Sequence, residues 1–213
     1  AIMSGVILKI GIYGLVRTLS FFYDVPLWWG ATVLALGVVS GVVGVVFAIG
    51  QHDLKRLLAC SSIENIGIIY IGIGVALIGV TNHSGLLILL GMGGALLHVI
   101  NHALFKALLF LGTGSVIHAV GTRQIDRMGG LLRRMPRTGL FFLVGAVAIC
   151  GLPPLNGFVS ELLIYLGMFN GAMQGSGAAA VALAAPFLAL VGGLAVACFV
   201  KVFGVVFLGT ART

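Results

Sequence analysis

Charged residues are scarce in this sequence. Asp, Glu, Lys and Arg make up 8% of its 213 residues, and only five residues are acidic. Soluble domains carry roughly a quarter of their residues as charged side chains, so this composition excludes a soluble globular domain. Hydrophobic residues make up 60% of the chain, and its mean hydropathy is +1.21. Such a chain is typical of a protein that crosses a membrane several times.

Cysteines are also few and scattered. Cys60, Cys150 and Cys198 show no CxxC spacing, so neither a disulfide framework nor an iron–sulfur site is expected. Motifs for haem or nucleotide binding are lacking as well, and we therefore expect no redox cofactor in this chain. The sequence starts without methionine and has no charged segment before its first apolar run, which argues against a signal peptide. We expect it to be a piece of a longer protein.

The apolar segments predict an all-α polytopic membrane protein with about seven transmembrane helices, since a crossing needs about 20 residues. The predicted spans are 2–22, 31–50, 63–80, 86–118, 139–155, 157–173 and 179–209. Abundant glycine fits this class because small residues let membrane helices approach closely, as at Gly37 and Gly41. Pro153 and Pro154 interrupt the helix between the fifth and sixth spans. We therefore expect at least one discontinuous helix, and the alternative count is six spans.

Basic residues are concentrated in two of the expected connections, 51–62 and 119–138. Two spans separate these connections, so both lie on the same side of the membrane. In the connections on the other side, the only charged or histidine residues are Asp24 and His83. By the positive-inside rule, the arginine-rich side is cytoplasmic. The net charge of +7 is thus interpreted as a topology signal, and we expect a lipid bilayer rather than nucleic acid as the partner.

One polar stripe stands out in the long segment 86–118. His98, His102 and Lys106 follow one another at intervals of four residues, so on a helix they form a line roughly 12 Å long on one face. Ionisable groups are costly in a bilayer and usually face a protein interior or a water path that moves ions or protons. Proton hopping needs such groups a few ångströms apart. The stripe therefore predicts proton or ion conduction.

Two other interpretations of the stripe remain open. A membrane histidine can be a structural hydrogen-bond donor between helices. A histidine pair four residues apart can also hold a metal, although a lysine in third place and the lack of a nearby carboxylate or cysteine disfavour it. We predict no metal site.

Three further charged residues lie in apolar segments and are candidate proton-transfer residues. Glu161 lies one turn past the proline break, while Lys9 and Lys201 lie in the first and last segments. Burial disfavours the charged form of such groups, which makes a change of protonation accessible. The alternatives are a salt bridge that pins helices together for Glu161 or Lys9, and snorkelling to the interface for Lys201.

Two other ionisable residues lie at the ends of apolar segments. His118 ends the long segment about 200° around the helix from His98, so it is off the stripe; it is a candidate for proton uptake or release. Glu64 begins the third span and is interpreted as a residue that favours a helix N-terminus.

Three motifs resemble a known family. The stretches QHDLKRLLACSSIENIG (51–67) and NHALFKALLFLG (101–112) resemble the signature of the antiporter-like, proton-translocating subunits of respiratory complex I. With GLPPLNGFVSE (151–161), the chain looks most like the large membrane subunit of formate-hydrogenlyase-type membrane-bound hydrogenases. The motifs extend over nearly the whole chain.

The resemblance implies a fold of about fourteen helices with two inverted repeats of five helices, each containing a broken helix. Residues 1–50 would end the first repeat and residues 63–209 would form the second. Lys9 would be the lysine of the first broken helix and Glu161 the acidic residue of the second. The stripe would lie on the helix that connects them.

We therefore expect a proton-translocating membrane subunit of a redox-driven complex in the cytoplasmic (inner) membrane of a prokaryote. Its expected partners are other membrane subunits and a peripheral arm similar to nickel–iron hydrogenase. Protons would pass between Lys106 and Glu161 through the histidines and bound water. The alternatives are a subunit of a multi-subunit sodium/proton antiporter and a structural hydrogenase subunit that does not conduct.

Overall fold

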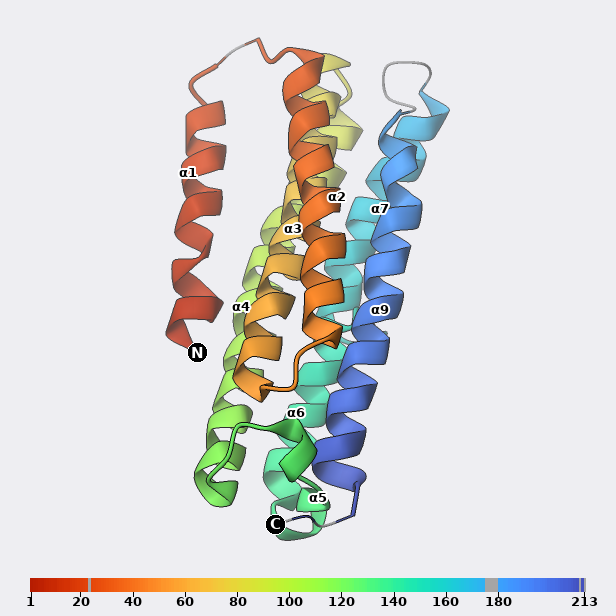
Figure 1. Ribbon diagram of the computed structural model, residues 1–213. Coiled ribbons are helices and arrows are strands. Elements are labelled where there is room, and N and C mark those ends of the chain that lie inside the picture. Colours follow the sequence, from red (N-terminus) through yellow and green to blue (C-terminus); the bar gives the residue numbers. More distant parts are fainter. Residues whose placement is uncertain (23, 175–179, 211, 213) are drawn as a thin grey trace.

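The computed structural model describes all residues except 23, 175–179, 211 and 213. The described residues form helices and no β-strand, apart from one isolated bridge between Asp53 and Gln124. In chain order, with η for short π- or 3₁₀-helices, the elements are η1 (Met3–Ile7), α1 (Lys9–Leu19), α2 (Leu27–Ile49), α3 (Leu54–Thr81), α4 (Gly85–Val120), η2 (Ile125–Arg127), α5 (Leu131–Arg134), α6 (Pro136–Ile149), α7 (Asn156–Met173), η3 (Ala180–Ala184), α9 (Ala185–Phe203) and η4 (Gly204–Leu208). The long helices run side by side, and α1 stands at the edge of the bundle (Figure 1).

The prediction of an all-α membrane protein is confirmed. Among the described residues, four helical stretches are long and apolar enough to cross a membrane: α2, α3, α4 and Val181–Leu208, which contains α9. The predicted span 2–22 is divided into the π-helix η1 and α1. The other two predicted spans correspond to α6, which has only 14 residues, and to the more polar α7.

The predicted connection 51–62 is wrong from Leu54 onward, because α3 begins at that residue. Asp53 precedes this helix, and its carboxylate accepts hydrogen bonds from the backbone N–H groups of Lys55 at 2.9 Å and Arg56 at 3.0 Å. Such a cap satisfies N–H groups that have no partner within the helix, so the helix can start there. As a result, residues 54–62 are helical and their side chains join the bundle.

α3 is the central helix and packs against both α2 and α4. Its close approach to α2 depends on glycine in both helices. A Cβ atom on Gly67 would lie 2.4 Å from the backbone nitrogen of Gly41, and one on Gly37 would lie 2.6 Å from that of Ile71. The expectation that small residues bring helices together is confirmed here.

The chain is broken between α6 and α7, as the prolines predicted. α6 ends at Ile149 and α7 starts at Asn156, with a turn between them that contains Gly151 at φ +60° and a cis bond between Pro153 and Pro154. The predicted discontinuous helix is therefore confirmed, and it places a non-helical segment inside the bundle.

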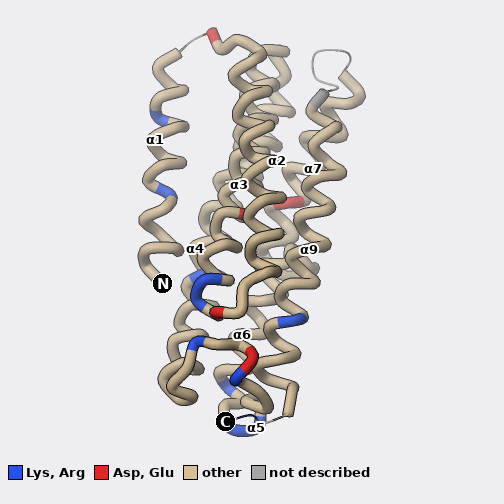
Figure 2. The backbone as a smooth tube through the Cα atoms, viewed as in Figure 1, with Lys and Arg blue, Asp and Glu red and all other residues tan. Residues whose placement is uncertain are grey.

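Most basic residues gather at one end of the bundle, around α5 and the start of α3 (Figure 2). The two basic connections meet there: Leu54 N–H donates to Arg123 O at 3.1 Å, and Ile125 N–H donates to His52 O at 2.9 Å. Their predicted location on one side is thus confirmed. We call this end the basic end; its cytoplasmic orientation stays a prediction.

Candidate functional site

The predicted stripe on α4 faces the interior. His98, His102 and Lys106 are all fully buried, whereas Ile100 and Leu104 on the other side of the helix are about 60% exposed. The stripe side of α4 packs against neighbouring helices, mainly α3, α6 and α7. The predicted placement of these three ionisable side chains on one face of a helix is therefore confirmed, and they lie in a row inside the protein.

Lys106 makes its polar contacts with α3. Its Nζ donates a hydrogen bond to the carbonyl oxygen of Leu58 at 2.7 Å and another to the hydroxyl of Ser61. Both acceptors lie in the segment that Asp53 allows to be helical. A buried ammonium is costly unless hydrogen bonds or charges compensate it, and Glu64 supplies a carboxylate within electrostatic reach.

Glu64 is the main residue that sequence reasoning missed. It was interpreted as a helix N-terminal residue, and this is wrong because α3 begins at Leu54 and leaves Glu64 well inside the helix, 1% exposed. Its Oε2 atom has no hydrogen-bond partner among the described residues. Lys106 and Glu161 both lie within its electrostatic reach. The sequence did contain a usable signal for Glu64, a carboxylate within an apolar stretch. The same feature identified Glu161 as a candidate.

Glu161 lies against the helix break, as expected. It is 9% exposed, and a Cβ atom on Gly151 would lie only 2.6 Å from its Oε2 and 2.7 Å from its Oε1. Glu64 interacts electrostatically with both Lys106 and Glu161. The expected route from Lys106 to Glu161 therefore gains an intermediate that the sequence analysis lacked.

His98 connects α3 to α7 through both ring nitrogens. Nε2 lies 3.1 Å from Asn65 Oδ1, and Nδ1 lies 2.9 Å from Ser160 Oγ. Because the Asn65 amide NH₂ donates to the Ser61 carbonyl at 2.8 Å, its Oδ1 is an acceptor, which places a proton on Nε2. Neutral His98 then accepts from Ser160, and protonated His98 donates to it. Ser160 can instead donate to Gly157 O at 2.9 Å.

Two asparagines extend this network to the break. Asn101 Nδ2 donates to the Asn156 carbonyl at 2.8 Å and to Ser160 Oγ at 3.1 Å, while Asn156 Nδ2 donates to Asn101 Oδ1 at 3.0 Å. Asn101 lies on α4 and Asn156 opens α7. These contacts fix the start of α7 against the stripe. Both residues were overlooked, although amides in apolar runs are a usable signal.

His102 lies between His98 and Lys106, and it is the least satisfied member of the stripe. Neither of its ring nitrogens has a hydrogen-bond partner among the described residues. By contrast, both nitrogens of His98 are engaged, so the two histidines do not present a free pair for a metal. The described residues contain no group of three or more His, Cys, Asp or Glu that could hold one.

Lys9 joins the stripe from a different part of the chain. In the π-helix η1 that precedes it, Leu8 N–H donates to Met3 O at 3.3 Å, and Lys9 Nζ donates to Ser4 O at 2.9 Å. Lys9 is 9% exposed and lies within electrostatic reach of all three stripe residues. A π-helical turn frequently marks a functional position.

Two other candidates lie apart from this group. His118 is exposed near the end of α4. Lys201 is half-buried, and its Nζ donates to the carbonyl of Ile49, the last residue of α2, at 3.0 Å. A cation at a helix C-terminus satisfies a free carbonyl and the helix dipole. The structure therefore brings together Lys9, the stripe and Glu161, but not His118 or Lys201.

Residues 1–189 match the family described as NADH:quinone oxidoreductase/Mrp antiporter, transmembrane. The chain belongs to this family. The resemblance noted in the sequence is thereby confirmed, and the buried groups described above are the interior of one of its members.

Two relatives of this family member come from Escherichia coli (strain K12). Hydrogenase-4 component B is 46% identical over 220 residues and formate hydrogenlyase subunit 3 is 43% identical over 217 residues. Each alignment covers 100% of this chain but only 32% and 35% of the relatives. The chain thus spans about a third of the length of these proteins.

Two solved structures have a similar fold. One chain of the membrane-bound sulfane sulfur reductase, an archaeal respiratory membrane complex, matches with a TM-score of 0.81 and 28% identity over 99% of this chain and 33% of that chain. The Mrp complex from Dietzia sp. DQ12-45-1b matches with a TM-score of 0.71 and 25% identity over 87% of this chain and 30% of that one. Relatives of this family member are thus components of membrane complexes with several subunits.

Proposed function

We propose that this chain is part of a proton-translocating membrane subunit of a redox-driven complex. The observation that carries the proposal is the set of buried ionisable residues that influence one another electrostatically, from Lys9 at the π-helix across the stripe and Glu64 to Glu161 at the break. Ionisable groups inside an apolar bundle usually mark a path for ions or protons. None of them makes an ion-pair contact with another described residue, as a purely structural salt bridge would require.

The route follows from which groups reach one another. A proton on Lys106 passes to the carboxylate of Glu64, which leaves two neutral groups and avoids the cost of separated buried charges. Glu64 then passes the proton to Glu161 beside the break and returns to its starting state. His102, between Lys106 and His98, exchanges protons along α4, because each nitrogen of an imidazole ring can donate or accept and neither is engaged by another described residue.

The relatives' names support a more specific setting. They include a hydrogenase component and a formate hydrogenlyase subunit, so the partners we propose are other membrane subunits and a peripheral arm similar to nickel–iron hydrogenase. The redox chemistry belongs to that arm, and this chain holds no redox cofactor. We place the complex in the inner membrane of a prokaryote with the basic end in the cytoplasm.

The test is proton flux in sealed proteoliposomes that contain the full complex. Glu161→Gln keeps the size of the side chain and removes its titration, so it should abolish flux while the complex assembles and its partner chemistry continues. Full flux in this variant contradicts the route. A complex that assembles but carries no proton flux in its unmodified form supports the structural alternative instead.

The sodium/proton antiporter alternative is favoured by the similarity of this fold to a chain of the Mrp complex. Purification separates the two functions, because hydrogenase-like subunits should accompany the chain only in a redox-driven complex. A sodium requirement for flux, in the absence of such subunits, would support the antiporter.

A further inference from the structure

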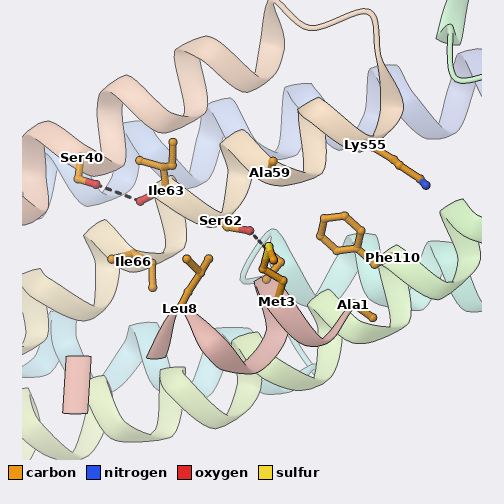
Figure 3. A pocket seen from close by; sticks show the side chains of 11 residues that line it. Ala1, Met3, Leu8, Ser40, Lys55, Ala59, Ser62, Ile63, Ile66 and Phe110 are labelled. Carbon is orange, nitrogen blue, oxygen red and sulfur yellow. Dashed lines mark hydrogen bonds between the residues drawn. The ribbon is translucent and has the colours of Figure 1, made fainter. Parts of the chain in front are cut away.

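A pocket of about 610 Å³ lies between η1, α3 and α4, outside the line of buried groups. Figure 3 shows its walls, and the apolar side chains labelled there include Met3, Leu8, Ile63, Ile66 and Phe110. Lys55 lies at one end, on the first turn of α3, and its ammonium points away from the other side chains (Figure 3). The pocket therefore extends from the basic end toward the interior of the bundle.

Two serine hydroxyls line this pocket where η1 meets α3. Ser4 Oγ and Ser62 Oγ are in hydrogen-bond contact, and either can be the donor (Figure 3 marks this bond at Ser62). Ser62 is 2% exposed and Ser4 is half-buried. A hydroxyl both donates and accepts, so this pair can give one proton and take another at the same moment.

The serine pair also joins the two buried lysines. Lys9 Nζ donates to the backbone carbonyl of Ser4 at 2.9 Å. Ser62 Oγ donates to the carbonyl of Leu58 at 3.1 Å, and the same carbonyl accepts from Lys106 Nζ at 2.7 Å. The hydroxyl of Ser62 and the ammonium of Lys106 are thus neighbours at one oxygen atom. That carbonyl accepts hydrogen bonds but cannot pass on a proton, so the last transfer requires the Ser62 hydroxyl to turn from the carbonyl to the neighbouring Lys106 nitrogen.

We propose that this pocket is a proton uptake site, in which the Ser4–Ser62 pair takes protons from water at the basic end and delivers them to Lys106. The proposal rests on the proposed proton-translocating function and adds an access route to it. In one transfer, a hydronium ion in the pocket gives its excess proton to the serine pair. Each hydroxyl gains one proton and loses one, the neutral amine of Lys106 becomes an ammonium, and a water molecule remains in the pocket.

The chain offers a matched control on the same pocket. Ser40 lines it as well, but its hydroxyl donates to the Ile63 carbonyl at 3.1 Å, and the described hydrogen bonds of Lys9 and Lys106 go to other residues. Removal of this hydroxyl perturbs the same wall without interrupting the proposed transfer. Ser62→Thr provides the second control because it keeps a hydroxyl at the position that Ser62→Ala leaves empty.

The first measurement is proton flux through the full complex in sealed proteoliposomes. Ser4→Ala and Ser62→Ala should each lower flux about 100-fold, the low end for loss of a positioned proton-transfer group. Ser62→Thr and Ser40→Ala should keep flux within about twofold of the unmodified complex, well below a loss of that size. Unchanged flux in both alanine variants overturns the uptake site but leaves the proposed function standing. Absence of flux in the unmodified complex overturns both.

The second measurement tests whether water reaches the pair. Ser62→Cys is made with the three native cysteines replaced by alanine, and the complex is treated with a charged thiol reagent from the basic end. Reaction requires a hydrated thiolate, so we expect labelling, and we expect the label to block flux. An unlabelled cysteine in a complex of normal assembly means that water and the reagent do not reach the pair, and this result overturns the proposal.

Discussion

His98 Nδ1 lies 2.9 Å from Ser160 Oγ, and this contact ties the middle of α4 to the first turns of α7. The hydroxyl of Ser160 has one proton and two acceptors in reach, His98 and the carbonyl of Gly157. Protonation of His98 makes its Nδ1 a donor, so the hydroxyl must turn to Gly157. Protonation of His98 on α4 therefore changes the hydrogen bonding of Ser160 on α7, the helix that carries Glu161.

Ser160→Ala should weaken this link. It removes a buried hydroxyl that contacts His98 and Asn101, and each lost hydrogen bond costs about 1 kcal/mol of stability. We expect a lower thermal midpoint and a several-fold loss of proton flux. Ser115→Ala is the control, because its hydroxyl donates to Leu111 O on the exposed face of α4. Equal flux in the two variants would contradict the link.

Glu64→Gln should abolish proton flux while assembly continues. The amide keeps the size of the side chain but cannot accept a proton from Lys106, and Glu64 Oε2 has no hydrogen-bond partner in the described part of the chain that the change would break. Flux is measured with a pH-sensitive dye inside proteoliposomes. Asp126→Asn, on an exposed acid paired with His52, should leave flux unchanged. Normal flux in the Glu64→Gln variant would remove this carboxylate from the route.

Lys106→Met and Lys106→Arg separate charge from proton exchange. Methionine removes the ammonium, whereas arginine keeps the positive charge but does not deprotonate. We expect both to stop flux, and flux that survives in the arginine variant would mean that only the charge is needed. Lys201→Met is the control: its ammonium contacts the carbonyl of Ile49 at the end of α2, so we expect near-normal flux and about 0.3–1 kcal/mol lower stability.

Gly151→Ala should distort the break. Gly151 has φ +60°, and a Cβ atom would lie within 2.8 Å of three atoms of the Glu161 carboxyl group. The backbone strain alone costs about 1 kcal/mol, and the carboxylate must also move. We expect a lower thermal midpoint and slower flux. Gly114→Ala, where a Cβ meets nothing within 4 Å, should change neither, and equal behaviour of the two variants would refute the contact.

Orientation can be tested by chemical labelling. Arg127→Cys places a thiol on the exposed 3₁₀-helix at the basic end, and Asp24→Cys places one at the exposed opposite end. A membrane-impermeant thiol reagent should label the Arg127→Cys variant only in inside-out vesicles and the Asp24→Cys variant only in right-side-out ones. The reverse pattern would place the basic end outside the cytoplasm.

Local patterns in the sequence were enough for most of the fold. The scarcity of charge predicted the membrane, the prolines predicted the break after α6, and the spacing of four residues placed His98, His102 and Lys106 on one buried face. These features depend on composition or on one turn of helix, so neighbours in the sequence decide them.

The partners of those residues depend on contacts between distant segments. Nothing near Lys106 in sequence indicates that it binds Leu58, or that Glu64 interacts with it electrostatically. Those contacts exist because Asp53 starts α3 early and glycines let α2 approach α3 closely. The rotation of α3 about its axis and its position along α4 then decide which polar groups come into contact. The sequence by itself determined that a line of ionisable groups would be buried, and the packing of the helices decided their order, since a buried polar group takes whichever partner the neighbouring helix presents.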